Sequence, residues 1–171
     1  MITLFGFKDT ISEKVLHEVE GDRKYILTSE VEAIENFVEQ VLLLKPAFIL
    51  GMGEYSGRDQ DKLRVEERCT HKFRNRRVGE IPSYEIRPFE GHLRGVRLPN
   101  EKLQAHLGGV LMKHTRAMGN SYCNLVSYLL MHEITKNKLR TKYGFIHIPR
   151  FFDVKIAGQE IQNLLKHTRG V

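Results

Sequence analysis

The chain has little cysteine, no long apolar run and few aromatic side chains. Two cysteines in 171 residues are too few for a disulfide scaffold, which favours a reducing compartment such as the cytoplasm. The most apolar stretch, residues 41–52, is interrupted by Lys45 and Pro46, so it falls short of the roughly 18 apolar residues that a membrane helix needs. The first residues also lack the basic start and apolar core of a signal peptide. We therefore expect a cytoplasmic protein with no membrane partner.

The composition is that of a folded chain with an excess of basic side chains. Hydrophobic residues make up 41% and charged residues 28%, and the length suits one domain spanning residues 1–171. The formal net charge is +6, with basic clusters in residues 68–77 and 136–142. Neither cluster accompanies a nucleic-acid motif, and aromatic residues are only 9% of the chain, so solvated faces are the better interpretation. Nucleic acid is not an expected partner.

The hydrophobic pattern alternates between strand and helix signals. Ser29 and Glu32 form a capping-box pair, and the helical spacing that follows should end before Pro46. A turn at residues 119–121 introduces another helix, and apolar positions in 156–165 indicate a last one. Short β-type runs lie at residues 2–7, 23–27, 47–51 and 143–148. This rhythm predicts an α/β layered fold.

Three further segments are less regular. Residues 63–73 are interpreted as one strand with a solvent-exposed face, and residues 109–113 as another strand. Residues 79–100 contain three prolines and three glycines without periodicity, which predicts a long irregular loop.

Cys123 is the residue with the clearest chemical potential. It follows a Gly-Asn-Ser turn and falls in the first turn of the predicted helix, where backbone N–H groups and the helix dipole stabilise a thiolate. A strand, turn and helix in this order also present a nucleophile at the rim of a sheet. Taken alone, however, a cysteine is more often a small buried hydrophobic residue.

His147 is the only polar side chain within the apolar run 145–148. At the carboxyl end of a strand its imidazole would face a ligand crevice, although a core histidine bonded to a carbonyl is as good an interpretation. Together, Cys123 and His147 form the pair by which thiol hydrolases activate a nucleophile. A carboxylate would complete the set, and Glu67 is one candidate among many.

Three blocks of this sequence resemble those of type I pyroglutamyl peptidases, also called pyrrolidone-carboxylate peptidases. Residues 119–124 read G-N-S-Y-C-N, similar to the family's A-G-T-aromatic-x-C-N block. Residues 144–149 read G-F-I-H-I-P and match the family's G-F-I-H-I-P block. Residues 66–69 read E-E-R-C and resemble its glutamate block, with Glu67 in the catalytic position.

The resemblance implies a three-layer α/β/α sandwich of the phosphorylase/hydrolase-like kind. It implies a cysteine exopeptidase whose catalytic residues are Cys123, His147 and Glu67, with Arg77 near the substrate. The expected partner is a small peptide with a blocked amino terminus, and family members often form homo-oligomers, commonly tetramers. No metal or organic cofactor is implied. The sequence H-E at 132–133 does not begin a zinc motif, because Lys136 stands where the second histidine should be.

The first loop departs from the family pattern. The family reads G-F-x-P-F-G there, and its second Phe helps to form the lactam pocket. This chain keeps Phe7 as one wall but has Thr10 or Ile11 where the second Phe is expected. It is also shorter than typical members. A relative with another acyl preference, or a binding-only member that takes an acyl or anionic ligand, therefore remains an alternative.

Overall fold

A computed structural model describes residues 1–58, 60–87, 89 and 110–168. In chain order its elements are β1 (Ile2–Phe7), α1 (Ile11–Glu18), β2 (Arg23–Leu27), α2 (Val31–Leu43), β3 (Phe48–Tyr55), β4 (Leu63–Glu66), β5 (Arg68–Thr70), β6 (Lys72–Phe73), β7 (Arg76–Arg77), β8 (Ser83–Glu85), β9 (Leu111–His114), α3 (Tyr122–Lys136), β10 (Lys142–Pro149) and α4 (Val154–Thr168).

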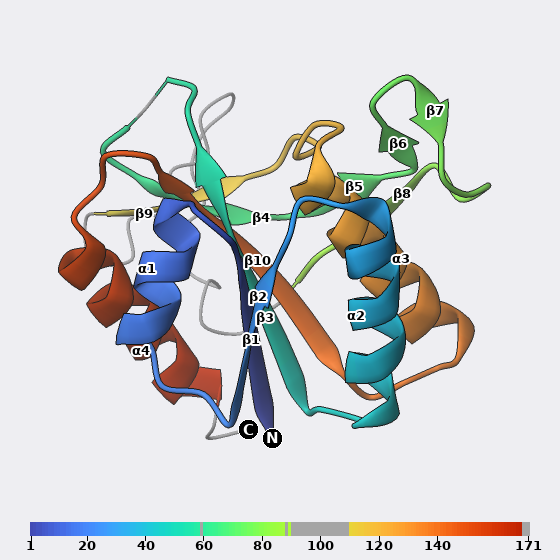
Figure 1. Ribbon diagram of the computed structural model, residues 1–171, viewed down its shortest axis with the longest axis horizontal. Helices are drawn as coiled ribbons and strands as arrows, with labels where there is room; N and C mark the ends of the chain where they lie inside the picture. The colour runs from blue at the N-terminus through green and yellow to red at the C-terminus, as the bar shows by residue number, and fades with distance from the viewer. Residues whose placement is uncertain (59, 88, 90–109, 169–171) are drawn as a thin grey trace.

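The main sheet has six strands in the order β2-β1-β3-β10-β4-β9. The first four run parallel, so their carboxyl ends share one edge of the sheet. β4 is antiparallel to β10, and β9 is parallel to β4. Figure 1 shows α1 and α4 on one side of the strands and α2 and α3 on the other, which confirms the α/β/α layering expected from the sequence.

Strand alternation divides the core into two hydrophobic clusters. Leu4 and Leu50 pack against α1 and α4, whereas their neighbours Phe5 and Ile49 pack against α2 and α3. All four side chains are fully buried. Side chains of odd and even positions on β10 are separated in the same way, so the face on which a residue lies follows from its place in the strand.

Several predicted boundaries are wrong. Residues 63–73 are not one strand, because the chain leaves the main sheet after Glu66 and forms β5 and β6 in two small sheets. α2 is not capped by Ser29, since its N-cap is Glu30 without a side-chain hydrogen bond. The expected loop 79–100 contains β8, but residues 88 and 90–100 lie outside the described residues. No helix within the described ranges is long and apolar enough to cross a membrane.

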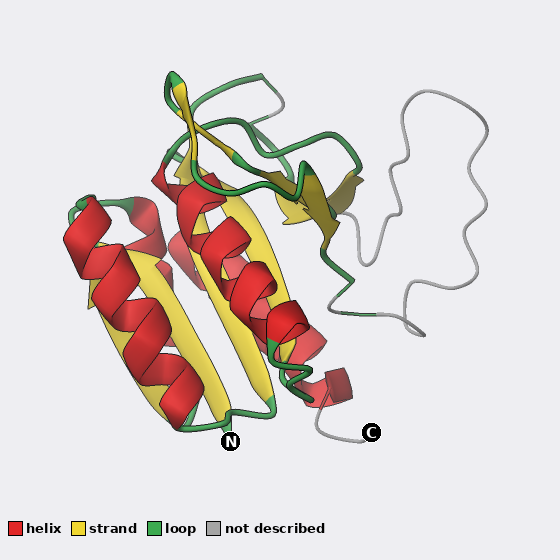
Figure 2. Ribbon diagram, turned by 90° about the vertical axis from the view of Figure 1, so that its right-hand side faces the viewer, coloured by secondary structure: helices red, strands yellow, loops and turns green. Residues whose placement is uncertain are grey.

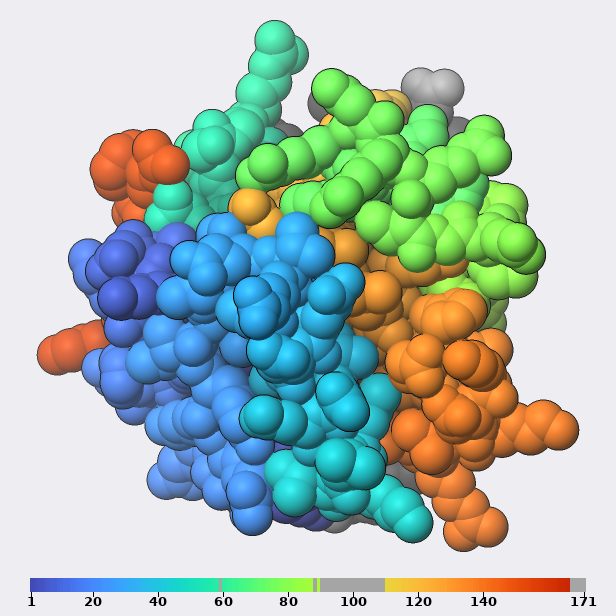
Figure 3. Space-filling view, turned by 45° about the vertical axis from the view of Figure 1, so that its right-hand side comes forward, coloured from blue at the N-terminus to red at the C-terminus, as the bar shows by residue number. Residues whose placement is uncertain are grey.

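Two small antiparallel pairs, β5–β8 and β6–β7, lie beyond the end of the main sheet (Figure 2). Asn124 of α3 holds this region by accepting a hydrogen bond from the Thr70 N–H and donating to the carbonyls of Thr70 and Lys72. In Figure 3 the green segment that carries these strands rests on the orange segment of α3. The start of α3, where Cys123 lies, is thereby fixed between the sheet and the small strands.

Candidate active site

The turn at residues 119–121, directly before α3, places Cys123 at the start of that helix. Gly119 has a φ of +91°, a conformation that glycine adopts without a steric penalty. Ser121 is the N-cap, and the Leu125 N–H donates to its carbonyl, so Cys123 is the second helical residue. The thiol is partly exposed. The thiol therefore lies in the first turn of α3, at the positive end of the helix dipole, which is the position that the sequence predicted.

His147 lies near the carboxyl end of β10, opposite Gly53 of β3. It shares a face with Phe145, and the two rings are in edge contact with centroids 5.0 Å apart. That face is covered by α2 and α3, so the imidazole points to the side of the sheet on which Cys123 lies.

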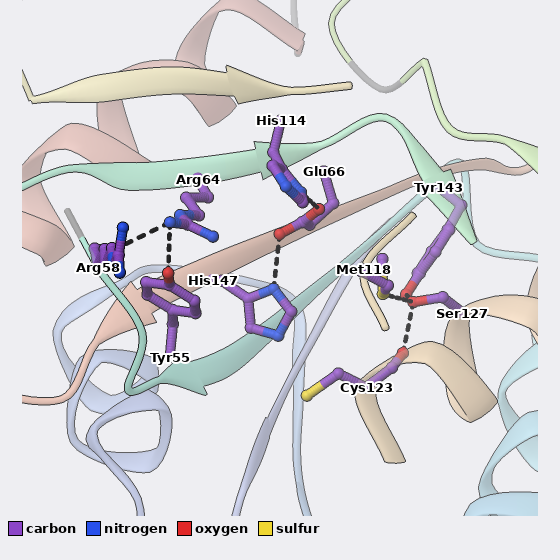
Figure 4. Close-up of polar contacts among 10 residues, drawn as sticks. All are labelled: Tyr55, Arg58, Arg64, Glu66, His114, Met118, Cys123, Ser127, Tyr143 and His147. Carbon is purple, nitrogen blue, oxygen red and sulfur yellow. Dashed lines mark hydrogen bonds and ion pairs between the residues drawn. The ribbon is translucent and has the colours of Figure 1, made fainter. Parts of the chain in front are cut away.

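Gly53 is the floor between the two residues. A Cβ added there would lie 2.7 Å from the Cys123 Sγ and 3.1 Å from the His147 Cδ2. The contact with sulfur is closer than real side chains come, and the contact with the imidazole is tighter than most. Sulfur and imidazole therefore meet over a backbone position where any side chain would force them to shift. Figure 4 shows the Cys123 sulfur on the side of the His147 ring that carries Nε2.

A buried carboxylate holds the other ring nitrogen of His147. Glu66 Oε1 lies 2.7 Å from His147 Nδ1, and the Glu66 side chain is only 1% exposed. The second oxygen, Oε2, lies 2.6 Å from His114 Nδ1. Figure 4 shows Glu66 between the two imidazoles. The result is a chain of contacts from His114 through Glu66 and His147 toward Cys123.

The expected contact between Glu67 and His147 is wrong by one residue. Glu66 is the last residue of β4 and lies on the same face as Arg64, which is opposite His147. Glu67 turns to the other side, where its carboxylate pairs with Lys113 Nζ at 2.9 Å. Successive strand side chains point to opposite faces, so adjacent glutamates cannot both reach the imidazole.

The charges of this cluster support one another. Burial would lower the pKa of His147, but hydrogen bonds to Cys123 and Glu66 raise it from 6.5 to about 9. Burial would raise the pKa of Glu66, but hydrogen bonds from His114 and His147 lower it below 4.5. The arrangement therefore favours an ionised carboxylate and a protonated imidazole beside the sulfur.

The raised pKa of His147 makes stability depend on pH. A protonated His147 stabilises the folded state fully below its unfolded pKa near 6.5, and this contribution is lost as the pH rises through about 9. We expect the free energy of unfolding, measured by urea titration, to fall by roughly 3 kcal/mol between these limits. Cys123→Ala removes a contact that raises the pKa of His147, so the free energy of unfolding of this variant should fall clearly less over the same pH range. Equal losses in both proteins would contradict the coupling.

Comparisons with known proteins identify the family of this chain. The family described as pyroglutamyl peptidase matches residues 13–164. This chain belongs to that family.

Relatives cover most of the chain at modest identity. A pyrrolidone-carboxylate peptidase of Bacillus thuringiensis subsp. konkukian is 26% identical over 146 residues, which are 82% of this chain and 67% of the relative. One from Bacillus cereus is 24% identical over 170 residues, covering 94% and 78% of the two chains. The pyrrolidone carboxyl peptidase structure of Thermus thermophilus has a TM-score of 0.72 at 18% identity and covers 98% of this chain and 100% of its own. That of Thermococcus litoralis has a TM-score of 0.74 at 16% identity, with 96% and 91% covered. Family membership supports a peptidase.

The residues expected in a family-type substrate pocket are dispersed. Phe7 is buried in the hydrophobic cluster against which Cys123 packs. Thr10 caps α1, donating to the Phe7 carbonyl at 2.7 Å and accepting from the Ser12 N–H. Ile11 is buried in the other cluster, on the α1 and α4 side of the sheet. Arg77 lies in the exposed β6–β7 hairpin. Of these four residues, the structure therefore brings Phe7 alone into the cluster that Cys123 joins.

Sequence reasoning missed Glu66, His114 and the pair formed by Arg64 and Tyr55. The Arg64 guanidinium lies 3.5 Å above the centre of the Tyr55 ring and also donates to the Tyr55 hydroxyl. Tyr55 in turn lies beside His147, with ring centroids 6.4 Å apart. The one available signal was β alternation in 63–66, which places Arg64 and Glu66 on one face.

Proposed function

We propose that this chain is a cysteine exopeptidase that removes pyroglutamate from the amino terminus of peptides. Cys123 is the nucleophile, His147 the general acid and base, and Glu66 the carboxylate that orients the imidazole. The observation that carries the proposal is the meeting of Cys123 and His147 over Gly53, with Glu66 2.7 Å from His147 Nδ1. Family membership supplies the reaction class.

The geometry assigns a task to each atom. Because Nδ1 of His147 is engaged by Glu66, Nε2 is the nitrogen that exchanges a proton with the Cys123 thiol. The thiolate attacks the carbonyl carbon of the pyroglutamyl residue, and N–H groups in the first turn of α3 are available to stabilise the oxyanion. His147 then gives its proton to the leaving amine, and a thioester to Cys123 remains. Water, deprotonated by His147, attacks the thioester and releases pyroglutamate.

The acyl preference is the open part of the proposal. A pyroglutamyl ring is small, flat and uncharged, so its recognition needs apolar walls and a few polar groups. Phe7 is retained, but Thr10 is used as a helix cap and Ile11 is buried on the other face of the sheet. The first loop therefore does not supply the second aromatic wall. This observation favours, as a second candidate, a thiol hydrolase with the same catalytic residues and a different small acyl group.

An amide panel distinguishes the two candidates. Hydrolysis of pyroglutamyl aminomethylcoumarin should be compared with the alanyl, prolyl and acetyl amides of the same dye. We expect the highest kcat/KM for the pyroglutamyl amide. A higher value for another acyl group would favour the second candidate, and inertness toward all four at high enzyme concentration would contradict both.

Selective alkylation tests the nucleophile independently of any substrate. Burial raises the pKa of the Cys69 thiol to about 12, and this side chain is fully buried. Cys123 is partly exposed at a helix start beside an imidazole whose pKa is raised. Near neutral pH, iodoacetamide should therefore modify Cys123 at least 100-fold faster than Cys69, measured by mass spectrometry of peptides. Comparable rates would contradict an activated Cys123.

Gly53→Ala should impair catalysis without unfolding the chain. The new methyl would lie within 3.1 Å of the Cys123 Sγ and of the His147 ring, so the sulfur must move away from the imidazole. A displacement of about 1 Å can cost roughly 100-fold in rate, and we expect a loss of kcat of that order. The urea midpoint should change far less. Gly79→Ala is the control, because its new methyl would meet the Tyr128 ring and so crowds a place away from the sulfur. Gly119→Ala is unsuitable, because the positive φ of Gly119 would strain the backbone of an alanine.

A further inference from the structure

His114 contacts the carboxylate of the proposed triad on the side away from His147. It is the last residue of β9, and its Cα partner in the parallel ladder is Glu66. The two side chains share a face, and His114 Nδ1 lies 2.6 Å from Glu66 Oε2. The His114 side chain is 22% exposed, while that of Glu66 is 1% exposed. His114 thus lies between a buried carboxylate and solvent.

His114 supplies a hydrogen bond to the second oxygen of the Glu66 carboxylate. An ionised carboxylate only accepts hydrogen bonds, so both imidazoles must present an N–H at Nδ1. With one donor on each oxygen, the buried charge of Glu66 is compensated and its plane is fixed toward His147. Without His114, Oε2 would lose the hydrogen-bond donor that compensates its buried charge, which favours the protonated carboxyl.

We infer that His114 is a positioning residue that keeps Glu66 charged and directed at His147, and so sustains the thiolate of Cys123. This inference rests on the proposed function. His114 touches neither the sulfur nor the reacting imidazole in the chain of contacts described above, so its effect is transmitted through Glu66. The site has four members, in the order Cys123, His147, Glu66 and His114.

Two other charged side chains near this contact, Arg64 and Lys113, have partners of their own. On β4, Arg64 lies on the same face as Glu66 and donates to the Tyr55 hydroxyl and the Arg58 carbonyl. On the opposite face, Lys113 of β9 pairs with Glu67 at 2.9 Å. The last two residues of β9 therefore each pair with a glutamate at the end of β4 or directly after it. One pair is directed to His147 and the other is directed away. The outward pair provides a matched control for the inward one.

Three variants separate positioning from simple packing. His114→Asn keeps an N–H donor near the place of Nδ1, His114→Ala removes it, and Lys113→Met removes the outward pair. We expect kcat/KM on the pyroglutamyl amide to fall roughly 10- to 100-fold in His114→Ala. His114→Asn should regain most of that loss, and Lys113→Met should stay within about twofold of the unmodified chain. Loss of the donor also destabilises the carboxylate. The acid limb of the pH profile of His114→Ala should therefore lie about one unit higher, while the basic limb, where Glu66 stays ionised, should move little.

Alkylation of Cys123 gives the same comparison without a substrate. The rate with iodoacetamide at pH 6 should fall in His114→Ala and be restored in His114→Asn, since it reports the thiolate alone. If no amide is hydrolysed but this pattern appears, the proposed reaction fails while the role of His114 stands. The inference is overturned if His114→Ala matches the unmodified chain in rate and pH profile. It is equally overturned if the Ala and Asn variants lose activity alike with an unshifted profile, which is the signature of a packing role.

Discussion

Replacing Cys123 by Ser is expected to lower kcat by roughly 10⁴-fold or more while the chain stays folded. The loss is large because the hydroxyl of serine is far less acidic than a thiol, and the imidazole is tuned to hold a proton beside a thiolate. The fold should survive because Cys123 is partly exposed at the start of α3 and only borders the hydrophobic cluster. The change from sulfur to oxygen removes little packing.

The measurement is single-turnover and steady-state hydrolysis of the pyroglutamyl amide, with the urea midpoint as the check on folding. Cys123→Ala should be as inactive as Cys123→Ser. Cys69→Ala is the matched control: it removes a buried thiol from the same cluster and should lower stability by about 1 kcal/mol while leaving kcat nearly unchanged. Full activity of Cys123→Ala would require another nucleophile and would end the cysteine-peptidase proposal.

The fold could be predicted because its strongest signals are local. β1 and β2 have the bounds that the apolar runs indicated, and α3 begins directly after the predicted Gly-Asn-Ser turn. α1 was not predicted: five of its eight residues are polar or charged, and its burial depends on α4, which lies far away in the chain. Long-range packing of this kind produces only a weak hydrophobic pattern in the sequence of a short helix.

The site was predictable only as far as local sequence carries it. Cys123 and His147 each lie in a distinctive block, and the structure brings them together over Gly53. The choice between Glu66 and Glu67 depends instead on where β4 ends and how it registers against β10. The contact of His114 with Glu66 depends on the pairing of β4 with β9, which joins positions 48 residues apart. Neither register leaves a signal within a few residues of the side chain concerned.

Glu66→Gln and Glu67→Gln should therefore differ sharply in activity. A glutamine at 66 has one carbonyl and no charge, so it can accept from only one of the two imidazole N–H groups. Its NH₂ group forces the other histidine into a different tautomer. If that histidine is His147, its proton moves to Nε2 and faces the sulfur. Whichever histidine is affected, the His147 imidazolium loses the negative charge of Glu66 beside it. We expect kcat to fall by roughly 10²- to 10⁴-fold, in line with the loss of an orienting carboxylate in other triads.

Glu67→Gln is the neighbouring control with the same chemical change. Its carboxylate is 29% exposed and pairs with Lys113, an arrangement that contributes about 0–1 kcal/mol to stability and is not directed at His147. kcat should stay within about threefold, and iodoacetamide should alkylate Cys123 at the unmodified rate, whereas Glu66→Gln should slow it at pH 6. The reverse result, with Glu67→Gln inactive and Glu66→Gln active, would restore the assignment suggested by the sequence block. It would also mean that the functional register of β4 against β10 differs by one residue from the pairing of His147 with Arg64.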